Sequence, residues 1–402
     1  MREMKDSGIE WIGEIPKNWE LKRLQYSLNE VNVKNFPIKT EQVLSLVKDK
    51  GVMLYEDKGN QGNKAKEDVT EYKVAFPNTL IVNSMNILIG SVGISNYLGC
   101  VSPVYYVFKE TENSDLRFIN YIFNTREFQS ELRRYANGIL EIRLRVSSSD
   151  IFKRKIALPT KEEQSHIASF LDSKCSEIDS LHSDINDQIE TLKEYKKSVI
   201  TEAVTKGLDP DVEMKDSGVE WIGEIPKRWE AIPVKYCFKI GNGSDPLTKE
   251  GETPVYGSGT KSFKTCTEFK NGPTVLLGRK GTVNIPQYID GKYWNVDTAF
   301  DAKSLGNYDL KLFYYCAICF DYENYSTQTA LPSMTQWDYN NFKLPLMNAS
   351  TQKQIVNFLD SKCSEIDSII ESKKQQLETL EQYKKSLIYE YVTGKKEVPA
   401  NA

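Results

Sequence analysis

Residues 170–180 read FLDSKCSEIDS, and residues 358–368 repeat these letters without a change, at an offset of 188. The same offset aligns residues 190–205 with residues 378–393, which share 11 of 16 positions. Repetition at one fixed offset over so long a stretch indicates a tandem duplication, and such a repeat sets the architecture of the whole chain.

A second repeated block shows how the two copies are ordered. Residues 4–20 read MKDSGIEWIGEIPKNWE and match residues 214–230 at 15 of 17 positions, now at an offset of 210. The two variable middles therefore differ in length by 22 residues. The first helical block leads directly into the second Trp-rich block. The last helical block can pack against the first Trp-rich block in the same way if the two ends of the chain meet in space. This cyclic order predicts a pseudo-twofold axis and two long helices that run antiparallel.

The shared blocks 161–206 and 349–395 carry a heptad pattern that predicts two long helices. In the first block one seam position recurs every seven residues, at Leu171, Ile178, Ile185, Leu192 and Val199. The alternate seam position is filled by Cys175, His182, Ile189, Lys196 and Ala203. The seam of the second block comprises Leu359, Cys363, Ile366, Ile370, Leu377, Leu380, Leu387 and Tyr391, with Lys373 and Lys384 as polar interruptions. Seams of this length favour a coiled coil, roughly 65–70 Å long, over ordinary amphipathic core helices.

Each variable middle has the composition of a compact α+β domain. The first has strand-forming runs at 79–82 and 104–108 and a helical stretch near 115–135. The second has a similar run at 275–277 and a helical stretch near 309–320. The expected domains are a first α+β domain at 1–157, a spacer helix and linker at 158–213, a second domain at 214–345 and a second spacer helix at 346–402.

Composition places the chain among globular proteins with enough length for two or three domains. It has 402 residues, of which 40% are hydrophobic and 27% charged, with a net charge of −4. It contains no apolar run of about 18 residues and no signal peptide, so we expect a cytoplasmic protein with no membrane contact. Seven cysteines are an odd number and are widely spread, which fits a reducing compartment rather than a disulfide framework.

Charge is unevenly distributed along the chain. Residues 21–157 carry a surplus of five positive charges and residues 231–345 a surplus of one, whereas residues 158–206 and 207–230 each have a net charge of −4. This polarity is expected if the variable domains touch a polyanion and the helices do not.

Catalytic motifs are not evident in the sequence. Residues 257–262 have the wrong spacing for a phosphate-binding loop, and no amino-methyltransferase motif is found. Both histidines, His166 and His182, fall in the first helical block, and Cys316 and Cys319 form a single pair with no second one. We therefore expect no catalytic site, metal or cofactor.

Several motifs together resemble one known family. They are the duplicated WIGEIPxxW block, the PVYGSG loop at 254–259, the LGRKG loop at 277–281, LPSMTQWD at 331–338 and the paired FLDSKCSEID helices. These motifs, in this cyclic order, closely resemble the specificity (S) subunits of type I restriction-modification systems. The resemblance covers essentially the whole chain.

The resemblance implies two α/β target-recognition domains, separated by the two antiparallel coiled-coil helices, that each read one half of a bipartite sequence in double-stranded DNA. It implies a scaffold for two adenine-N6 methyltransferase (M) subunits and for restriction (R) subunits, without catalysis by this chain. Base edges can be distinguished in the major groove, and sites one helical turn apart, ~34 Å, face the same side of the duplex. The unequal middles predict two dissimilar half-sites and thus an asymmetric target.

Polar and basic loops of the variable domains are the candidate DNA contacts. Amide and guanidinium groups can pair with base edges, and lysines with phosphate. In the first domain the candidates are Asn60, Gln61, Asn63, Lys64, Arg143, Arg145, Ser147 and Ser148. In the second domain they are Ser258, Thr260, Lys261, Arg279, Lys280, Thr327 and Gln328. Two glycines that allow close backbone approach flank Arg279 and Lys280. Trp11, Trp19, Trp221 and Trp229 suit a shared packing role.

Two alternatives to DNA recognition stay open. One is an interaction scaffold whose variable domains bind proteins and have no DNA readout of their own. The other is an enzyme with a nuclease-like site around Asp297, Asp301 and Lys303, which the missing motifs disfavour.

Overall fold

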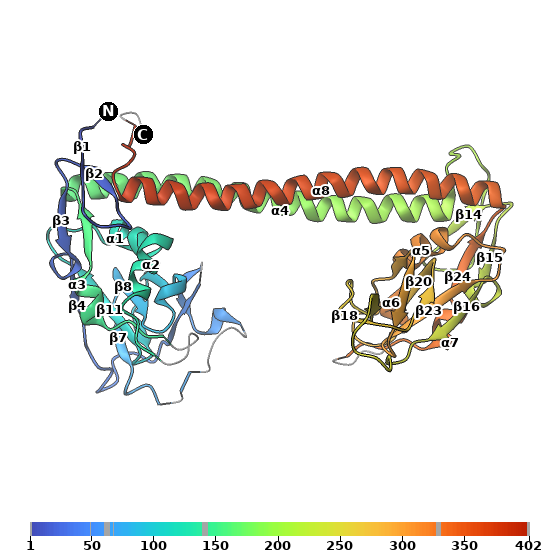
Figure 1. Cartoon of the computed structure of the whole chain (residues 1–402), viewed down its shortest axis with the longest axis horizontal. Coiled ribbons are helices and arrows are strands. Elements are labelled where there is room, and N and C mark those ends of the chain that lie inside the picture. Colours follow the sequence, from blue (N-terminus) through green and yellow to red (C-terminus); the bar gives the residue numbers. More distant parts are fainter. Residues whose placement is uncertain are drawn as a thin grey trace. The chain divides into compact units, whose positions relative to one another are not determined.

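The computed structural model describes residues 2–48, 50–59, 65–66, 68–138, 144–326 and 331–399. The chain divides into two compact units, unit 1 with Met1–Asp184 and Gln376–Ala402, and unit 2 with Ile185–Gln375. Each unit joins one mixed α/β domain to one end of each long helix, α4 (Lys161–Lys206) and α8 (Ala349–Val392) (Figure 1). The two long helices predicted from the repeats are thus confirmed.

In unit 1 the described part of the domain is built from antiparallel strands and three short helices. Its main sheet has the order β4-β11-β8-β9, formed by Leu28–Glu30, Tyr105–Glu110, Thr79–Asn83 and Val92–Ser95. The remaining strands pair as β1 (Met4–Asp6) with β2 (Glu14–Pro16), β3 (Glu20–Arg23) with β12 (Lys155–Leu158), β5 (Leu44–Val47) with β6 (Gly51–Leu54), and β7 (Lys73–Ala75) with β10 (Gly99–Val101). The helices are α1 (Leu116–Phe123), α2 (Arg126–Arg133) and α3 (Ser148–Lys153), with 3-10 turns at Leu24–Tyr26, Glu56–Lys58 and Ile87–Ile89.

Unit 2 repeats this plan and changes part of it. Its first sheet, β16-β23-β20-β21, is formed by Phe238–Asn242, Ala299–Ser304, Thr274–Gly278 and Gln287–Ile289 and has the same connectivity as the main sheet of unit 1. Hairpin β13 (Met214–Asp216) with β14 (Glu224–Pro226) and pair β15 (Glu230–Pro233) with β24 (Lys343–Leu346) also recur. A further sheet, β18-β17-β22-β19, is formed by Lys264–Cys266, Thr253–Tyr256, Lys292–Asn295 and Lys270–Asn271. The helices are α5 (Leu310–Cys319), α6 (Tyr322–Tyr325) and α7 (Gln336–Asn341), with a 3-10 turn at Val234–Tyr236.

The central strands form where the sequence predicted them. Strands β8 (TLIVN) and β20 (TVLLG) are buried at every position, as expected for apolar strands covered on both faces. The helix that follows each sheet begins at an aspartate, because the carboxylates of Asp115 and Asp309 accept the N–H groups of the first turns of α1 and α5. The predicted α+β class is thus confirmed.

Within each unit the ends of α4 and α8 pack against each other in antiparallel fashion. In unit 1, Lys384 Nζ lies 2.6 Å from the Asp179 carboxylate, and the rings of Phe170 and Tyr391 are 4.7 Å apart. In unit 2, Lys196 Nζ lies 2.6 Å from the carboxylate of Asp367. The repeat offset of 188 carries Asp179 onto Asp367 and Lys196 onto Lys384, so the two ion pairs exchange partners as a pseudo-twofold axis requires.

The two chain ends meet in unit 1, as the cyclic order of the blocks predicts. Arg2 contacts Glu163 at 2.5 Å and Glu397 at 3.0 Å, and Lys395 donates to the Ile12 carbonyl at 2.6 Å. Trp19 is fully buried there, and its indole N–H lies 3.2 Å from a carboxylate oxygen of Glu163. The N-terminal block thus joins the end of α8 without a covalent link (Figure 1).

The repeated tryptophans have the packing role predicted for them. Trp229 is buried in the core of unit 2, while Trp11 and Trp221 are half-buried and pack edgewise or at a tilt against Phe128 and Phe320. All seven cysteines are free and buried. In the part of the chain that the structure describes, no helix is both long enough and apolar enough to cross a lipid bilayer.

Candidate nucleic-acid interface

The C-terminal end of β20 brings several loops of the second domain together. The N–H of Arg279 donates to the Thr298 carbonyl at 2.8 Å, and the N–H of Gly281 donates to the Pro332 carbonyl at 2.9 Å. The hydroxyl of Ser258, which follows β17, lies beside Gly281. Three loops that carry predicted DNA contacts or family-like motifs therefore form one surface in unit 2.

Two glycines shape the central loop of this surface. A Cβ atom at Gly278 would lie 2.2 Å from the Thr282 carbonyl oxygen, and Gly281 has a φ of +82°. Both positions therefore require glycine for the path of the loop within the protein, and a close approach of its backbone to DNA stays a prediction. The buried hydroxyl of Tyr339 lies 2.7 Å from the Gly278 carbonyl oxygen and 3.3 Å from that of Val283, so it ties the two ends of the loop together.

The two basic residues of the loop are held differently. Arg279 is half-buried as a residue, and its guanidinium makes an exposed contact of 3.4 Å with the Asp297 carbonyl oxygen and lies 5.9 Å from the centre of the Phe300 ring. Lys280 is exposed, and its backbone pairs with Ser333. A restrained guanidinium suits geometric recognition of a base edge, whereas an exposed ammonium group suits a phosphate. Thr260 and Lys261 are exposed in the loop that begins at Ser258.

In the first domain the structure describes three of the predicted contacts. Arg145 is exposed, and its backbone is paired with Asn137. Ser147 begins α3: its hydroxyl accepts the N–H of Asp150 at 3.1 Å and lies 2.6 Å from the Asp150 carboxylate. Ser148 is half-buried in the first turn of that helix. The hydroxyl of Ser147 is thus engaged in starting a helix, and Arg145 is the more accessible of the three.

Seven predicted contacts lie outside the described residues: Asn60, Gln61, Asn63, Lys64, Arg143, Thr327 and Gln328. The first domain also holds a cavity of about 360 Å³ that the sequence did not suggest. Tyr55, Asn83 and Asn86 contribute polar groups to its wall, which also includes β5 and residues of the segments around Ile89 and Tyr105.

The nuclease-like alternative does not match the surroundings of Asp301. This aspartate is buried in β23, where its carboxylate lies 3.0 Å from the Tyr293 hydroxyl and 3.3 Å from Lys270 Nζ. Lys303 and Asp297 are exposed. Among the described residues, no group of three His, Cys, Asp or Glu side chains is arranged to hold a metal ion. Asp301 therefore serves the packing of the domain.

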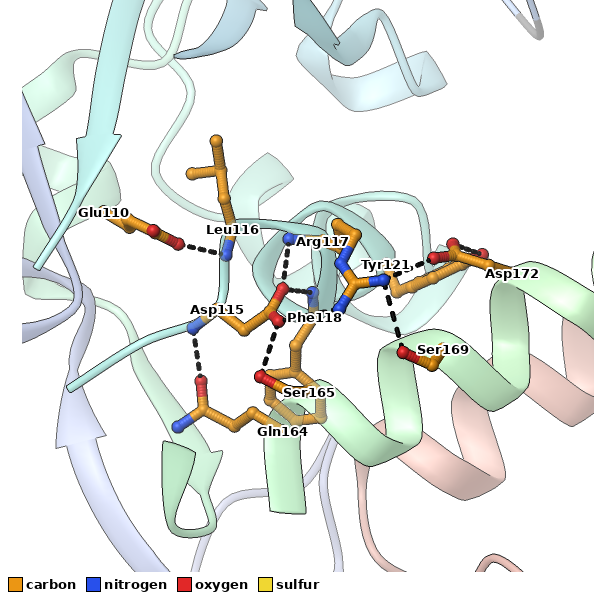
Figure 2. Close-up of polar contacts among 10 residues, drawn as sticks. All are labelled: Glu110, Asp115, Leu116, Arg117, Phe118, Tyr121, Gln164, Ser165, Ser169 and Asp172. Atoms are coloured by element: carbon orange, nitrogen blue, oxygen red, sulfur yellow. Dashed lines mark hydrogen bonds and ion pairs between the residues drawn. The ribbon is translucent and has the colours of Figure 1, made fainter. Parts of the chain in front are cut away.

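In unit 1 the α/β domain is attached to its long helix by a cluster of polar contacts, shown in Figure 2. Asp172 on α4 accepts hydrogen bonds from Arg117 Nη1 at 2.9 Å and from the Tyr121 hydroxyl at 2.7 Å, and both donors lie on α1. Burial and the adjacent carboxylate raise the pKa of Tyr121, so the hydroxyl stays protonated and donates. Sequence reasoning missed this attachment.

The same helix is attached at a second point, one residue before it begins. The N–H of Asp115 donates to Gln164 Oε1 at 3.0 Å, and Gln164 Nε2 donates to the Pro159 carbonyl at 2.9 Å. Ser165 donates to the Asp115 carboxylate at 2.8 Å. Gln164 is fully buried, so its amide has to be satisfied by such contacts.

Comparison with known proteins finds similarity to specificity subunits. The family model of the type I restriction modification DNA specificity domain matches residues 16–191 and 226–382. A putative type I restriction enzyme MjaX specificity subunit of Methanocaldococcus jannaschii is 27% identical over 433 residues, 96% of this chain and 95% of the relative. The type I restriction enzyme MjaVIII specificity subunit of the same organism is 28% identical over 279 residues, 60% of this chain and 62% of the relative.

Solved structures share the fold. A chain from a type I R-M system, studied for its complex assembly and conformational transition, has a TM-score of 0.74 at 12% identity and covers 95% of this chain and 99% of its own. The HsdS subunit from Thermoanaerobacter tengcongensis has a TM-score of 0.53 at 13% identity, with 98% and 100% covered.

We expect the substitution Tyr339→Phe to lower the free energy of unfolding by about 1–3 kcal/mol, because it leaves the buried carbonyls of Gly278 and Val283 without their donor. Chemical denaturation of the full chain measures this change. Tyr236→Phe is the matched control, since Tyr236 is exposed and the same atom is removed from it. Equal stability of the two variants would show that the hydroxyl does not hold the loop.

Proposed function

The chain belongs to the family of type I restriction-modification DNA specificity subunits, and from this premise we propose that it reads an asymmetric, bipartite DNA target with one domain in each unit. Its role in that family is DNA sequence specificity. The observation that carries the proposal is that the family model matches each repeat separately, at residues 16–191 and 226–382. Each match includes most of one α/β domain and part of one long helix, which supports one reader in each repeat.

The differences between the two domains support an asymmetric target. Both domains contain a four-stranded sheet with the same connectivity. Unit 2 also contains the four-stranded sheet β18-β17-β22-β19, whereas unit 1 has separate strand pairs instead. The loops that carry Ser258 and Arg279 follow strands of these sheets. Two readers built on different strands present different groups to a DNA groove, and they therefore select different bases.

We propose that Arg279, Lys280 and Ser258 form part of the reading surface of unit 2, and Arg145 part of that of unit 1. Thr260 and Lys261 extend the first of these surfaces along the same loop. The positive surplus over residues 21–157 supports contact with a polyanion. The contacts predicted for the residues outside the described part of the chain remain proposals on sequence grounds.

The long helices carry a duplicated row that supports docking of methyltransferase subunits. Each member of the row lies one residue before a seam residue, beginning before Cys175 in α4 and before Cys363 in α8. The members are Lys174, Leu181, Gln188, Tyr195 and Glu202 in α4 and Lys362, Ile369, Gln376, Tyr383 and Glu390 in α8. Its four large apolar members are 41–56% exposed. Some neighbouring exposed positions have diverged, for example Asp184 to Ser372, while others are retained, for example Glu177 and Glu365. Two of the five positions are large and apolar or aromatic in both copies, and their exposure fits a partner bound twice.

In each unit the row of one helix lies beside the row of the other. Lys174 lies near Tyr383 in unit 1, and Lys362 lies near Tyr195 in unit 2. Each unit therefore offers one equivalent surface, and we propose that each surface binds one adenine-N6 methyltransferase subunit. Restriction subunits would then join this complex as they do in the family.

The form of the DNA target tests the proposed reading directly. The chain, co-expressed with its methyltransferase partner, should direct adenine methylation to a split motif with two different half-sites and one fixed spacer. Single-molecule sequencing of host DNA detects the methylated adenines. A palindromic motif would contradict asymmetric reading. A stable complex without any motif would overturn DNA readout and favour the interaction-scaffold alternative.

Substitution of Lys280 tests its proposed contact with DNA. In the complex with methyltransferase, Lys280→Ala should weaken binding to all DNA sequences by a similar factor and reduce the slope of log K against log salt by about one, as loss of one phosphate contact does. Fluorescence anisotropy at several salt concentrations measures both quantities. Lys353→Ala, at an exposed position on α8, is the matched control. An unchanged slope would place Lys280 away from the DNA.

Substitutions in the duplicated row test the proposed docking surfaces. Tyr195→Ala and Tyr383→Ala should each weaken one of two equivalent methyltransferase sites by about 1–2 kcal/mol, the range of an exposed tyrosine anchor at an interface. Native mass spectrometry at limiting concentration should show one bound subunit for each single variant and none for the double variant. Tyr97→Ala, at an exposed tyrosine of the first domain, is the control. Two bound subunits in the double variant would locate the docking surface elsewhere.

A further inference from the structure

The polar attachment seen in unit 1 recurs in unit 2. Asp360 on α8 accepts hydrogen bonds from Lys311 Nζ at 2.7 Å and from the Tyr315 hydroxyl at 2.7 Å, and both donors lie on α5. Asp360 is the repeat equivalent of Asp172. In each unit one helix-borne aspartate thus receives a cation and a tyrosine that are four residues apart on the first helix after the main sheet.

The second attachment point recurs as well. The N–H of Asp309 donates to Gln352 Oε1 at 2.7 Å, and Gln352 Nε2 donates to the Met347 carbonyl at 2.9 Å. Gln352 and Asp360 are eight residues apart on α8, which corresponds to about 12 Å along a helix. Two points at this separation fix the rotation of a short helix against a long one, which a single contact cannot do.

The sequences of α1 and α5 isolate the residues that make these contacts. Residues 115–121 read DLRFINY and residues 309–315 read DLKLFYY. The aspartate, the leucine, the cation and the last tyrosine recur, while the three residues between the cation and that tyrosine differ. Outside the Trp-rich blocks the sequences of the two domains have largely diverged, and the attachment is retained among these divergent segments.

Stability alone does not account for this retention. The side chains of Asp172 and Asp360 are 46% and 35% exposed, and those of Arg117 and Lys311 are similarly accessible. Ion pairs with this exposure contribute little to the free energy of unfolding, because solvent screens them. Their directional contacts instead restrict where the domain can sit on its helix.

We propose that Asp172 and Asp360 are positioning residues that fix the orientation of each recognition domain on its long helix, and thereby the spacer length at which both half-sites are read. This inference rests on the proposed bipartite reading. Neither aspartate touches DNA in this account. They act through α1 and α5, which carry the rest of the domain.

The two attachments are not equally strong. In unit 1, Arg117 also contacts the Asp115 carboxylate at 3.1 Å and the Ser169 hydroxyl at 3.3 Å, and Ser165 adds its own bond to Asp115. In unit 2 the positions of Ser165 and Ser169 are occupied by Lys353 and Asn357. Loss of the aspartate should therefore loosen unit 2 more than unit 1.

The test uses the full chain co-expressed with its methyltransferase partner and counts methylated sites by spacer length. The measured ratio is the number of methylated sites with a spacer one base pair longer or shorter, divided by the number with the wild-type spacer. In Asp360→Ala this ratio should rise about threefold. A threefold change corresponds to ~0.7 kcal/mol, the contribution of one half-exposed ion pair. Asp172→Ala should give a smaller rise, and the double variant a larger one. The half-site sequences should not change.

Two sets of variants keep the result interpretable. Asp184→Ala and Glu371→Ala remove exposed carboxylates from the same two helices and should leave the ratio unchanged. Tyr121→Phe and Tyr315→Phe remove one hydrogen bond and keep the ion pair, so they should give part of the effect without a loss of fold. A single spacer in all the aspartate and tyrosine variants would overturn the inference. So would a loss of methylation at every spacer in Asp360→Ala while Tyr315→Phe keeps one spacer. If the wild-type complex gives no split motif, the proposed function itself fails.

Discussion

The fold depends on the register between the two long helices. Lys196 and Lys384 occupy seam positions and are 26% and 29% exposed, so each ammonium group is partly withdrawn from water and needs a partner nearby. Each reaches an aspartate of the opposite helix, Asp367 or Asp179. A slip of the helices by one heptad would separate each lysine from its partner, and polar seam residues specify register in this way at some cost in stability. Because the repeat exchanges the two pairs, one register satisfies both units.

With the register set, both Trp-rich blocks find the same packing by different routes. In unit 2 the chain continues from α4 through Gly207, which has a φ of +82° and lies beside Trp229. In unit 1 no covalent link exists, yet Gly394 lies beside Trp19 with a φ of +71°, and Arg2 closes the join. Burial of the tryptophan and a left-handed glycine at the helix end therefore determine this packing, and chain connectivity does not.

The parts of the fold that were predictable are those that repeat over long stretches. The seam that includes Leu171 extends over more than four heptads, so chance cannot mimic it. The attachment of Tyr121 and Tyr315 was not predicted, because its four recurring residues have an offset of 194, which matches neither of the longer repeats. Their common role is recognised only from the packing of α1 against α4. Ser147 shows the opposite case: Ser-x-x-Asp is a helix-start pattern that could have been recognised from the sequence. Base contacts stayed predictions because loop chemistry does not specify which base is read.

The structure separates what must stay fixed from what can change. The residues that recur lie at the junction with the long helix: Asp172 and Gln164 are on α4, and their partners are on or just before α1. Many of the residues that differ lie on the sheets and loops beyond, where β18-β17-β22-β19 has no counterpart of the same form among the described strands of unit 1. A new sheet or loop can therefore be accepted without disturbing the helices, provided that its first helix keeps an aspartate, a cation and a tyrosine in the same spacing. Diversity of recognition on a constant platform follows from this small set of contacts.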